Sequence, residues 1–271
     1  MDRGPRTYHR SAFTTDRLVP AKAGLKVTVC IPARDEERTV GAVVRAVVEP
    51  HVAAAGGSGL VDDVLVVDDG STDGTADVAR AAGARVISVD RGDGGGKGQA
   101  MRAGVDSSDG DLLVFLDADV ENTTPEFVSG LLGPLLTEPG VSLVKGFYER
   151  PVGDDPAGGG RVTELLARPL LEVLFPDLLP VRQPLAGESA APRRVLERLE
   201  LAEGYGVELG LLLDVASRYG TGSVTQVDLG VRVHRNRPLS ELRPQAVDVL
   251  RAALARAGRP NDLGFLPPGD R

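Results

Sequence analysis

The sequence contains one cysteine, no tryptophan and only three histidines among its 271 residues. A single cysteine cannot form a disulfide within the chain, which excludes a disulfide-stabilised fold. Cys30 lies within the apolar run VTVCI, so we expect it to be a core residue without a redox role.

Positive charge is also scarce, because 31 lysines and arginines stand against 39 aspartates and glutamates. The formal net charge of -8 and the pI near 5.0 argue against a nucleic-acid partner, since proteins that bind a phosphate backbone usually present a basic face. No apolar run is long enough to span a bilayer, and the first ten residues, MDRGPRTYHR, lack the apolar core of a signal peptide. We therefore expect a cytoplasmic protein without an integral membrane segment.

Hydrophobic residues make up 42% of the chain, which is enough for a substantial core. In the first half, apolar strand runs alternate with helical patterns, as in KVTVCIPA, ERTVGAVVRAVV, VDDVLVVDD and GTADVARAAG. This alternation predicts an α/β fold with a mostly parallel, doubly wound sheet flanked by helices. From about Val141 the regularity fades. There we expect a strand in LVKGFYERP, an amphipathic helix in RVTELLARPLLEVLF and a late strand in VTQVDLGVRVH.

Three predicted strands of the first half end in polar clusters, which are CIPARDEE, VVDDGST and FLDAD. The last cluster follows Leu112 to Leu116, a run without polar alternation that predicts a strand buried on both faces. Asp117 and Asp119 then stand at the edge of the sheet where α/β proteins bind ligands. Two like charges there resist desolvation unless something positive lies between them. A divalent cation is the obvious candidate, and an ordinary polar turn is the alternative.

The glycine-rich segment GDGGGKG lies near these clusters in the predicted fold. Its lysine, Lys97, supplies positive charge for a phosphate, while the acidic groups can accept hydrogen bonds from a ribose and a base. The spacing matches neither the P-loop nor the dinucleotide-binding G-x-G-x-x-G pattern, which disfavours an NTPase or a dehydrogenase. Taken alone, such a run is more often a flexible loop.

Among the three histidines, His234 is the best candidate for a metal ligand, because His9 lies in a polar leader and His51 near a helix end. His234 ends the alternating strand GVRVH and precedes Asn236 and Arg237. A mixed carboxylate and imidazole set with the DAD aspartates would suit Mn²⁺ better than an all-oxygen Mg²⁺ site. A polar residue without a ligand is the alternative at such a strand end.

Eight segments together closely resemble the glucosyl-3-phosphoglycerate synthases of actinobacteria, which are retaining glycosyltransferases of GT-A fold. They are IPARDEE, DDGSTDGT, GKG, FLDAD, LVKGFY, GGGRVTELLARPLL, GYGVELGLL and LGVRVHRNRPL. The resemblance runs from about Val27 to the last helix. IPA, DDGS and DAD indicate only a GT-A transferase, whereas GGGRVTEL, GYGVE and HRNRP are long enough to indicate the subfamily.

The resemblance implies a UDP-glucose donor, 3-phosphoglycerate as the acceptor, and Mg²⁺ or Mn²⁺ as the cofactor. Asp119 and His234 would be the metal ligands, and with Glu208 they would form the catalytic set. The implied donor-binding residues are Pro32, Ala33, Glu36, Asp68, Asp69, Lys97, Asp117, Ala118, Tyr205, Glu208, Arg232 and Arg237. The implied acceptor-binding residues are Gly160, Arg161, Val162, Thr163 and Asn236.

On this basis we expect glucose transfer to the 2-hydroxyl of 3-phosphoglycerate with retention of the α configuration. Four regions are expected: an N-terminal arm (1–24), a nucleotide-sugar-binding α/β region (25–145), a C-terminal acceptor-side subdomain that completes the metal site (146–256), and a tail (257–271). The resemblance also implies a homodimer.

Several departures from the family pattern leave alternatives open. Asp69 stands where the family is expected to have serine, and Ala186 and Ser189 stand where it typically has serine and tyrosine. The loops before Lys97 and before Gly159 also look shorter than is usual in the family. A GDP-sugar donor, another small anionic acceptor, a polyprenyl phosphate acceptor and an inactive sugar-nucleotide-binding module are the alternatives.

Overall fold

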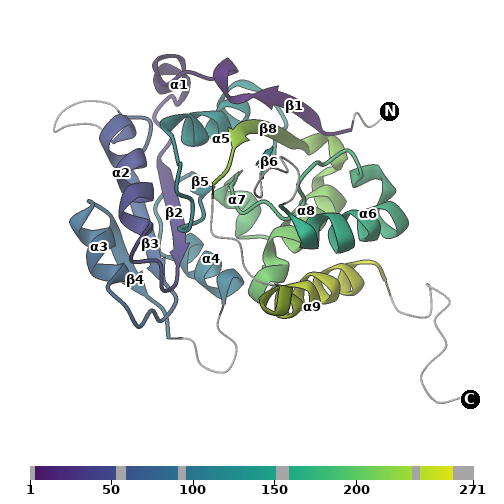
Figure 1. The fold of residues 1–271 in the computed structure, drawn as a ribbon. Coiled ribbons are helices and arrows are strands. Elements are labelled where there is room, and N and C mark those ends of the chain that lie inside the picture. The colour runs from purple at the N-terminus through teal and green to yellow at the C-terminus, as the bar shows by residue number, and fades with distance from the viewer. Residues whose placement is uncertain (1–3, 53–58, 91–95, 151–158, 234–238, 259–271) are drawn as a thin grey trace, which may run out of the picture.

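The computed structural model describes residues 4–52, 59–90, 96–150, 159–233 and 239–258 (Figure 1). Eight strands form one sheet in the order β1-β8-β6-β7-β5-β2-β3-β4. The strands are β1 (Arg6–His9), β2 (Val27–Ala33), β3 (Asp63–Asp68), β4 (Arg85–Ser88), β5 (Leu112–Phe115), β6 (Leu143–Glu149), β7 (Ser189–Pro192) and β8 (Val224–Val231). Within the described ranges, β7 pairs antiparallel with β5 and β6 while the other neighbouring strands pair parallel. The predicted mostly parallel α/β sheet is therefore confirmed.

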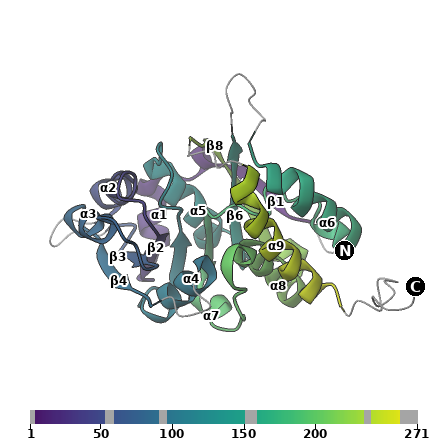
Figure 2. The same ribbon diagram turned by 60° about the horizontal axis from the view of Figure 1, so that its bottom comes forward.

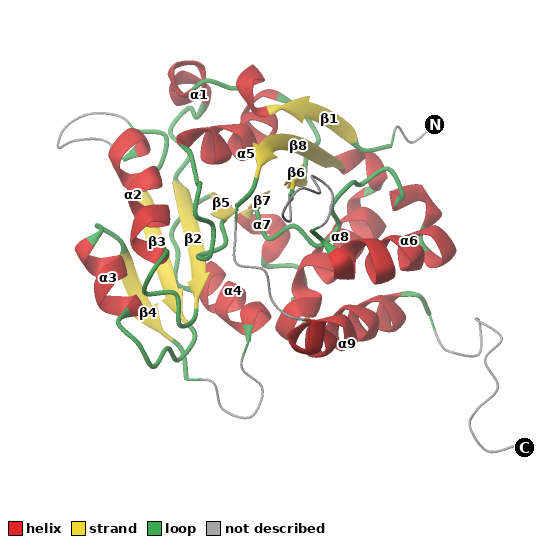
Figure 3. Cartoon of the chain, viewed as in Figure 1, coloured by secondary structure: helices red, strands yellow, loops and turns green. Residues whose placement is uncertain are grey.

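Helices cover both faces of this sheet, as Figure 3 makes plain. They are α1 (Thr15–Ala21), α2 (Val40–His51), α3 (Thr75–Ala81), α4 (Lys97–Asp106), α5 (Pro125–Thr137), α6 (Arg168–Leu174), α7 (Arg193–Leu196), α8 (Val207–Tyr219) and α9 (Leu239–Arg256). One apolar core joins the sheet to α1, α2, α3 and α5. The other joins it to α4, α6, α7, α8 and α9, and Figure 2 shows α9 lying along α8. No helix in the described part of the chain combines the length and apolarity needed to cross a membrane.

Strand β2 illustrates why its sequence lacks polar alternation. Val29 and Ile31 belong to one core, whereas Cys30 between them belongs to the other, so both sides of the strand are buried. Cys30 is fully buried, and desolvation by burial raises the pKa of its thiol to about 12. The predicted core role of this cysteine is confirmed.

The two halves of the chain share the one sheet. Strand β1 belongs to the predicted N-terminal arm, yet it pairs along its length with β8. The predicted boundary between residues 145 and 146 falls inside β6. Because β2, β3, β5, β6 and β8 all run in the same direction, their carboxyl ends meet at one edge of the sheet. The start of β7 lies at the same edge, since this strand runs the opposite way.

Candidate active site

The positive group between the two aspartates at the end of β5 is Arg232, which follows β8. Its Nη2 donates to Asp117 Oδ2 at 2.9 Å and to Asp119 Oδ1 at 2.7 Å. From the sequence we expected something positive between the two carboxylates, with a divalent cation as the obvious candidate, and Arg232 supplies positive charge there. The contact leaves Asp119 Oδ2 without a hydrogen-bond partner among the described residues, on a side chain that is 24% exposed.

Lys97, the first residue of α4, joins Asp117 to Glu208 in the first turn of α8. Its Nζ donates to Asp117 Oδ1 and lies 2.6 Å from Glu208 Oε1. Burial lowers the pKa of Lys97, but the two carboxylates outweigh it and raise this pKa well above its usual value. Burial likewise opposes ionisation of Asp117, yet the charges of Lys97 and Arg232 hold the pKa of this carboxyl below its usual range. The cluster is therefore a set of ionised pairs at neutral pH.

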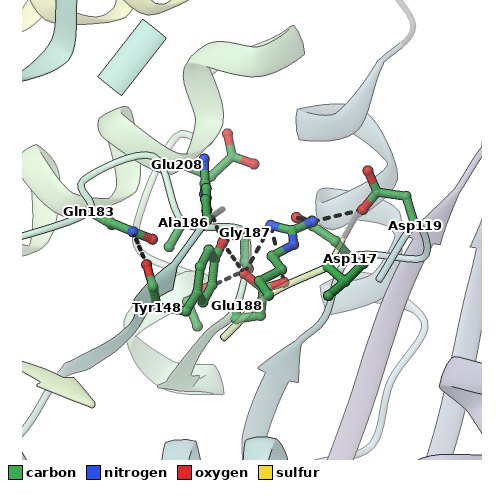
Figure 4. A network of polar contacts seen from close by, with 12 residues as sticks. Asp117, Asp119, Tyr148, Gln183, Ala186, Gly187, Glu188 and Glu208 are labelled. Atoms are coloured by element: carbon green, nitrogen blue, oxygen red, sulfur yellow. Dashed lines mark hydrogen bonds and ion pairs between the residues drawn. The ribbon is translucent and has the colours of Figure 1, made fainter. Parts of the chain in front are cut away.

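Tyr148 and Glu188 contact the Nη1 side of the Arg232 guanidinium, and Figure 4 shows them in the same polar network as Asp117 and Asp119. Arg232 Nη1 donates to the Tyr148 hydroxyl at 2.7 Å, and the hydroxyl donates to Glu188 Oε2 at 2.7 Å. Arg150 Nη2 donates to the same hydroxyl at 2.8 Å. Burial raises the pKa of Tyr148 to about 12, so the phenol keeps its proton across the physiological range. These contacts tie the end of β6 to the end of β8.

The segment that leads into β7 packs directly against Asp117. A Cβ on Gly187 would lie 2.1 Å from Asp117 Oδ1, so only glycine allows this approach. The preceding carbonyl, of Ala186, accepts a hydrogen bond from Lys145 Nζ at 2.5 Å. Lys145 is 1% exposed, and desolvation by burial lowers its pKa to about 8. A buried amine thus supports the loop beneath the aspartates.

Two cavities open on either side of this cluster. The larger, of about 490 Å³, we call the acidic cavity; it is lined by Pro32, Ala33, Arg34, Asp35, Glu36, Asp69, Gly96, Lys97, Ala100, Asp117, Ala118, Asp119, Tyr205 and Glu241. The smaller, of about 170 Å³, we call the basic cavity; it is lined by Lys97, Asp117, Asp119, Arg150, Gly160, Arg161, Val162, Thr163, Leu185, Tyr205, Glu208, Arg232, Leu242, Gln245 and Val249. The residues common to both are Lys97, Asp117, Asp119 and Tyr205.

The acidic cavity is built on the loops after β2 and β3, which are tied to each other. Asp35 adopts a left-handed backbone with φ of 51°, and its carboxylate accepts from the Thr72 N–H at 2.8 Å. In return the Asp35 N–H donates to Ser71 Oγ at 3.0 Å. Asp69 lies at the floor, where burial raises the pKa of its carboxyl and the nearby Arg34 partly offsets the effect. This cavity presents mainly hydrogen-bond acceptors.

The basic cavity has arginines on both sides of a glycine pair. The Gly159 N–H donates to the Arg150 carbonyl at 3.0 Å, and a Cβ on Gly159 would lie 2.5 Å from Arg150 Cβ. Glycine is therefore required where the chain returns against the end of β6. Gly160 follows with φ of 76°, and Arg161 and Thr163 then begin the helical segment that continues into α6. The result is a small space with three guanidinium groups, those of Arg150, Arg161 and Arg232, and the start of a helix.

The described residues suit a divalent cation at Asp119, although they supply only this one ligand. Its carboxylate lines both cavities, and carboxylate oxygen is a preferred ligand of Mg²⁺ and Mn²⁺. No group of three or more histidine, cysteine or acidic side chains suited to a metal occurs in the described part of the chain. The second predicted ligand, His234, lies outside the described residues, as do Asn236 and Arg237.

The structure brings almost all of the described predicted site residues to the two cavities. Asp68 is different: it lines neither cavity and accepts hydrogen bonds from the Ser71 N–H at 3.2 Å and the Ser88 hydroxyl at 3.5 Å. The sequence predicted no role for Arg150, although this residue lies at the end of the predicted strand LVKGFYERP, where the strand-end rule used for Asp117 would have found it. It also predicted none for Gln245 of α9, for which it carried no signal.

Comparison with known proteins gives a consistent picture. The model of Glycosyl transferase family 2 matches residues 28–172. The chain is 46% identical to the glucosyl-3-phosphoglycerate synthase of Mycobacterium tuberculosis over 279 aligned positions, which cover 97% of this chain and 84% of the relative. It is 37% identical to the synthase of Petrotoga mobilis over 93% of this chain and 80% of that one.

Solved structures agree with the sequence comparison. A crystal structure of the Mycobacterium tuberculosis synthase in complex with Mn²⁺, UDP-glucose and phosphoglyceric acid superposes with a TM-score of 0.85. The match has 44% sequence identity and covers 96% of this chain and 89% of that chain. A structure of the same synthase with Mg²⁺ and UDP matches with the same TM-score, 0.85.

Proposed function

Because the chain belongs to the glucosyl-3-phosphoglycerate synthases of glycosyl transferase family 2, we propose that it transfers glucose from UDP-glucose to 3-phosphoglycerate in a reaction that depends on Mg²⁺ or Mn²⁺. One observation in this chain's own structure supports the proposal. An acidic and a basic cavity, of different size and charge, meet at the same lysine and aspartates. A transferase needs this arrangement, since its two substrates must be held side by side.

In this proposal the acidic cavity holds the sugar nucleotide. Carboxylates such as Glu36 and Asp69 accept hydrogen bonds from ribose hydroxyls and base N–H groups. Asp119 and His234 would hold the metal ion, which would stabilise the negative charge that grows on the departing UDP. Lys97 stands where the two cavities meet and would face the diphosphate. Asp117 and Ala118 would contact the ribose and the sugar.

The basic cavity would hold the acceptor, which carries a phosphate and a carboxylate. Arg161 and Arg150 supply two positive groups, and the N–H groups at the start of the helical segment supply further donors. Thr163 is buried at the floor of the same cavity. A cavity of about 170 Å³ suits a small acid rather than a lipid phosphate. Asn236 is proposed to assist from the segment after β8.

Glu208 and Lys97 are the residues we propose to act nearest to the sugar. The carboxylate of Glu208 is 7% exposed and paired with Lys97, which fixes its direction at the boundary of the cavities. There it would accept a hydrogen bond from a sugar hydroxyl. We propose that the departing phosphate removes the proton of the acceptor 2-hydroxyl on the same face of the sugar, which yields the retained α configuration without a covalent enzyme intermediate.

The homodimer and the cytoplasmic location stay predictions. The homodimer has some support from the helical segment before and within α6. Leu165 and Val173 are each 77% exposed, which is unusual for large apolar side chains.

The proposed activity can be tested by incubating the protein with UDP-glucose, 3-phosphoglycerate and Mn²⁺. We expect a product heavier than the acceptor by one glucosyl unit, with an α linkage by NMR and with no product after EDTA treatment. Replacing the donor with GDP-glucose, and the acceptor with an uncharged alcohol, provides the controls. Efficient transfer from GDP-glucose, or transfer to the alcohol and none to 3-phosphoglycerate, would contradict the proposal.

A further inference from the structure

Glu188 is a completely buried carboxylate in the loop that leads into β7. Its side chain is 0% exposed, and it lines neither the acidic nor the basic cavity. Burying a carboxylate is costly unless it is paired and hydrogen-bonded. Figure 4 shows Glu188 in the same polar network as Tyr148, Asp117 and Asp119. Its contacts therefore need an explanation other than substrate binding.

The neighbours of Glu188 make it a partner of the guanidinium. Arg232 Nη1 lies 3.4 Å from Glu188 Oε1, and the Tyr148 hydroxyl donates to Oε2 at 2.7 Å. The single proton of the phenol goes to Glu188, because Arg232 and Arg150 both donate to the phenol oxygen. The Tyr148 hydroxyl and Arg232 Nη1 both donate to Oε2, so the ionised form fits these two donors although burial raises the pKa of this carboxyl. Oε1 has no hydrogen-bond partner among the described residues, and Arg232 is the cation beside it.

The two sides of the Arg232 guanidinium thus contact different groups. Its Nη1 side contacts Glu188 and Tyr148, which line neither cavity, whereas its Nη2 side contacts Asp117 and Asp119, which line both. The guanidinium is planar and rigid, so holding one side fixes the direction of the other. The negative charge of Glu188 also compensates part of the positive charge next to Asp119.

We propose that Glu188 is a positioning residue of the transferase: it holds Arg232 between Asp117 and Asp119 and lowers the positive potential there, so that Asp119 can bind a divalent cation. The inference rests on the proposed metal-dependent transfer. Without the charge of Glu188, Asp117 and Asp119 alone would compensate the guanidinium, which would then repel the cation and attract the diphosphate more strongly. The two ligands therefore respond in opposite directions, which a simple loss of structure would not produce.

The test is Glu188→Gln, which keeps the shape of the side chain and removes its charge. Mn²⁺ binding is measured by electron paramagnetic resonance without nucleotide, and UDP binding by calorimetry without metal. We expect the Mn²⁺ dissociation constant to rise about tenfold or more, because charges this close in a buried site are poorly screened. The UDP dissociation constant should stay the same or fall. Unchanged Mn²⁺ affinity, or a parallel loss of both ligands, would overturn the proposal.

Tyr148→Phe is the matched control, because it removes the hydrogen bond to Glu188 and those from Arg232 and Arg150 but leaves all charges in place. It should keep the Mn²⁺ affinity within about threefold. Glu188→Asp keeps the charge, so its Mn²⁺ affinity should also stay within about threefold of that of the wild type. This variant tests the proposal if the glutamine variant does not fold. An aspartate variant that folds with ten-fold weaker Mn²⁺ binding would contradict the charge argument. Both readouts are independent of the acceptor, so a wild-type protein that binds Mn²⁺ but transfers no glucose would overturn the proposed function without affecting this one.

Discussion

The acidic and basic cavities share one boundary but differ in charge and in construction. Six acidic and two basic side chains line the acidic cavity. Four basic and three acidic side chains line the basic cavity. A net-acidic protein thus concentrates positive charge at the smaller of the two sites, where a small anion would otherwise be repelled. The contrast indicates that the two cavities offer different partners to a ligand: mainly carboxylate acceptors in the acidic cavity and mainly positive charge in the basic cavity.

Their construction differs as well. The acidic cavity uses loops that follow consecutive strands and bond to each other, as Asp35 does with Thr72. The basic cavity is assembled from β6, the start of α6, the loop before β7 and α9, which are far apart in the chain. Between the two, Arg232 and Lys97 form buried ion pairs with Asp117. Substitutions at the boundary should therefore affect both substrates, whereas substitutions deeper in either cavity should affect one.

The largest effect is expected at the boundary. Asp119→Asn keeps the shape of the side chain but removes the charge that would hold the metal ion, so the turnover number should fall by about a thousandfold or more. His234→Ala carries the same expectation. Steady-state assays with UDP-glucose and 3-phosphoglycerate over a Mn²⁺ series provide the measurement. Asp68→Asn is the matched control, since Asp68 lines neither cavity. A comparable loss of turnover in that variant would mean that the effect is not specific to the boundary between the cavities.

The next effect separates the basic cavity from the acidic one. Arg161→Ala should raise the KM for 3-phosphoglycerate about ten- to a hundredfold, since an anchoring hydrogen bond to a charged group contributes about 1.5–3 kcal/mol. The KM for UDP-glucose should change little. Arg150→Met should act in the same direction, because no carboxylate of the described residues lies within 4.0 Å of Arg150 to compete for its charge.

Arg182→Ala provides the control for both arginine variants. Arg182 stacks on Phe147 at 4.7 Å and lines neither cavity, so its removal should leave both KM values near those of the wild type. If Arg161→Ala and Arg150→Met raised the KM values for both substrates equally, the two cavities would not be separate binding sites.

The sequence predicted the acidic cavity better than the basic one, and the reason is physical. Strand ends of a parallel sheet meet at one edge, so clusters after β2, β3 and β5 could be placed together from their order alone. Nothing comparable places Arg232 between Asp117 and Asp119, because the contact joins residues 113 positions or more apart. Only the resemblance to a family connected Arg232 with the donor site, and it gave no hint of Glu188 beneath it.

A smaller effect tests the acidic cavity by its base selectivity. UDP should bind more tightly than GDP in the presence of Mn²⁺, by about tenfold, because a related synthase has been solved with UDP and the residues that the resemblance assigns to the nucleotide, Pro32 and Asp69 among them, line the acidic cavity. Calorimetric titration of the two nucleotides is the measurement. Tighter binding of GDP would indicate a GDP-sugar as the donor. The assignment of donor and acceptor to separate cavities would still hold.

The smallest effect on activity, and the clearest on stability, concerns Lys145 beneath the boundary. Burial lowers the pKa of Lys145 in the folded protein from its ordinary value of 10.5 to about 8. The unfolded state therefore binds more protons between these pH values, and the free energy of unfolding should rise with pH across this window. Relative to Lys145→Met, the wild type should gain up to about 3 kcal/mol from pH 8 to 10.5. Urea denaturation at several pH values measures this, and parallel pH profiles of the two proteins would contradict it.

The central claim is that the donor and the acceptor occupy two adjoining cavities at the same time. It is tested most directly by calorimetric titration of 3-phosphoglycerate into the protein, first alone and then after saturation with UDP and Mn²⁺. Separate cavities predict that 3-phosphoglycerate binds in both cases, with dissociation constants that differ by less than about threefold. An apparent dissociation constant that rises in proportion to the UDP concentration would mean that the two ligands compete for one site, and would contradict the account.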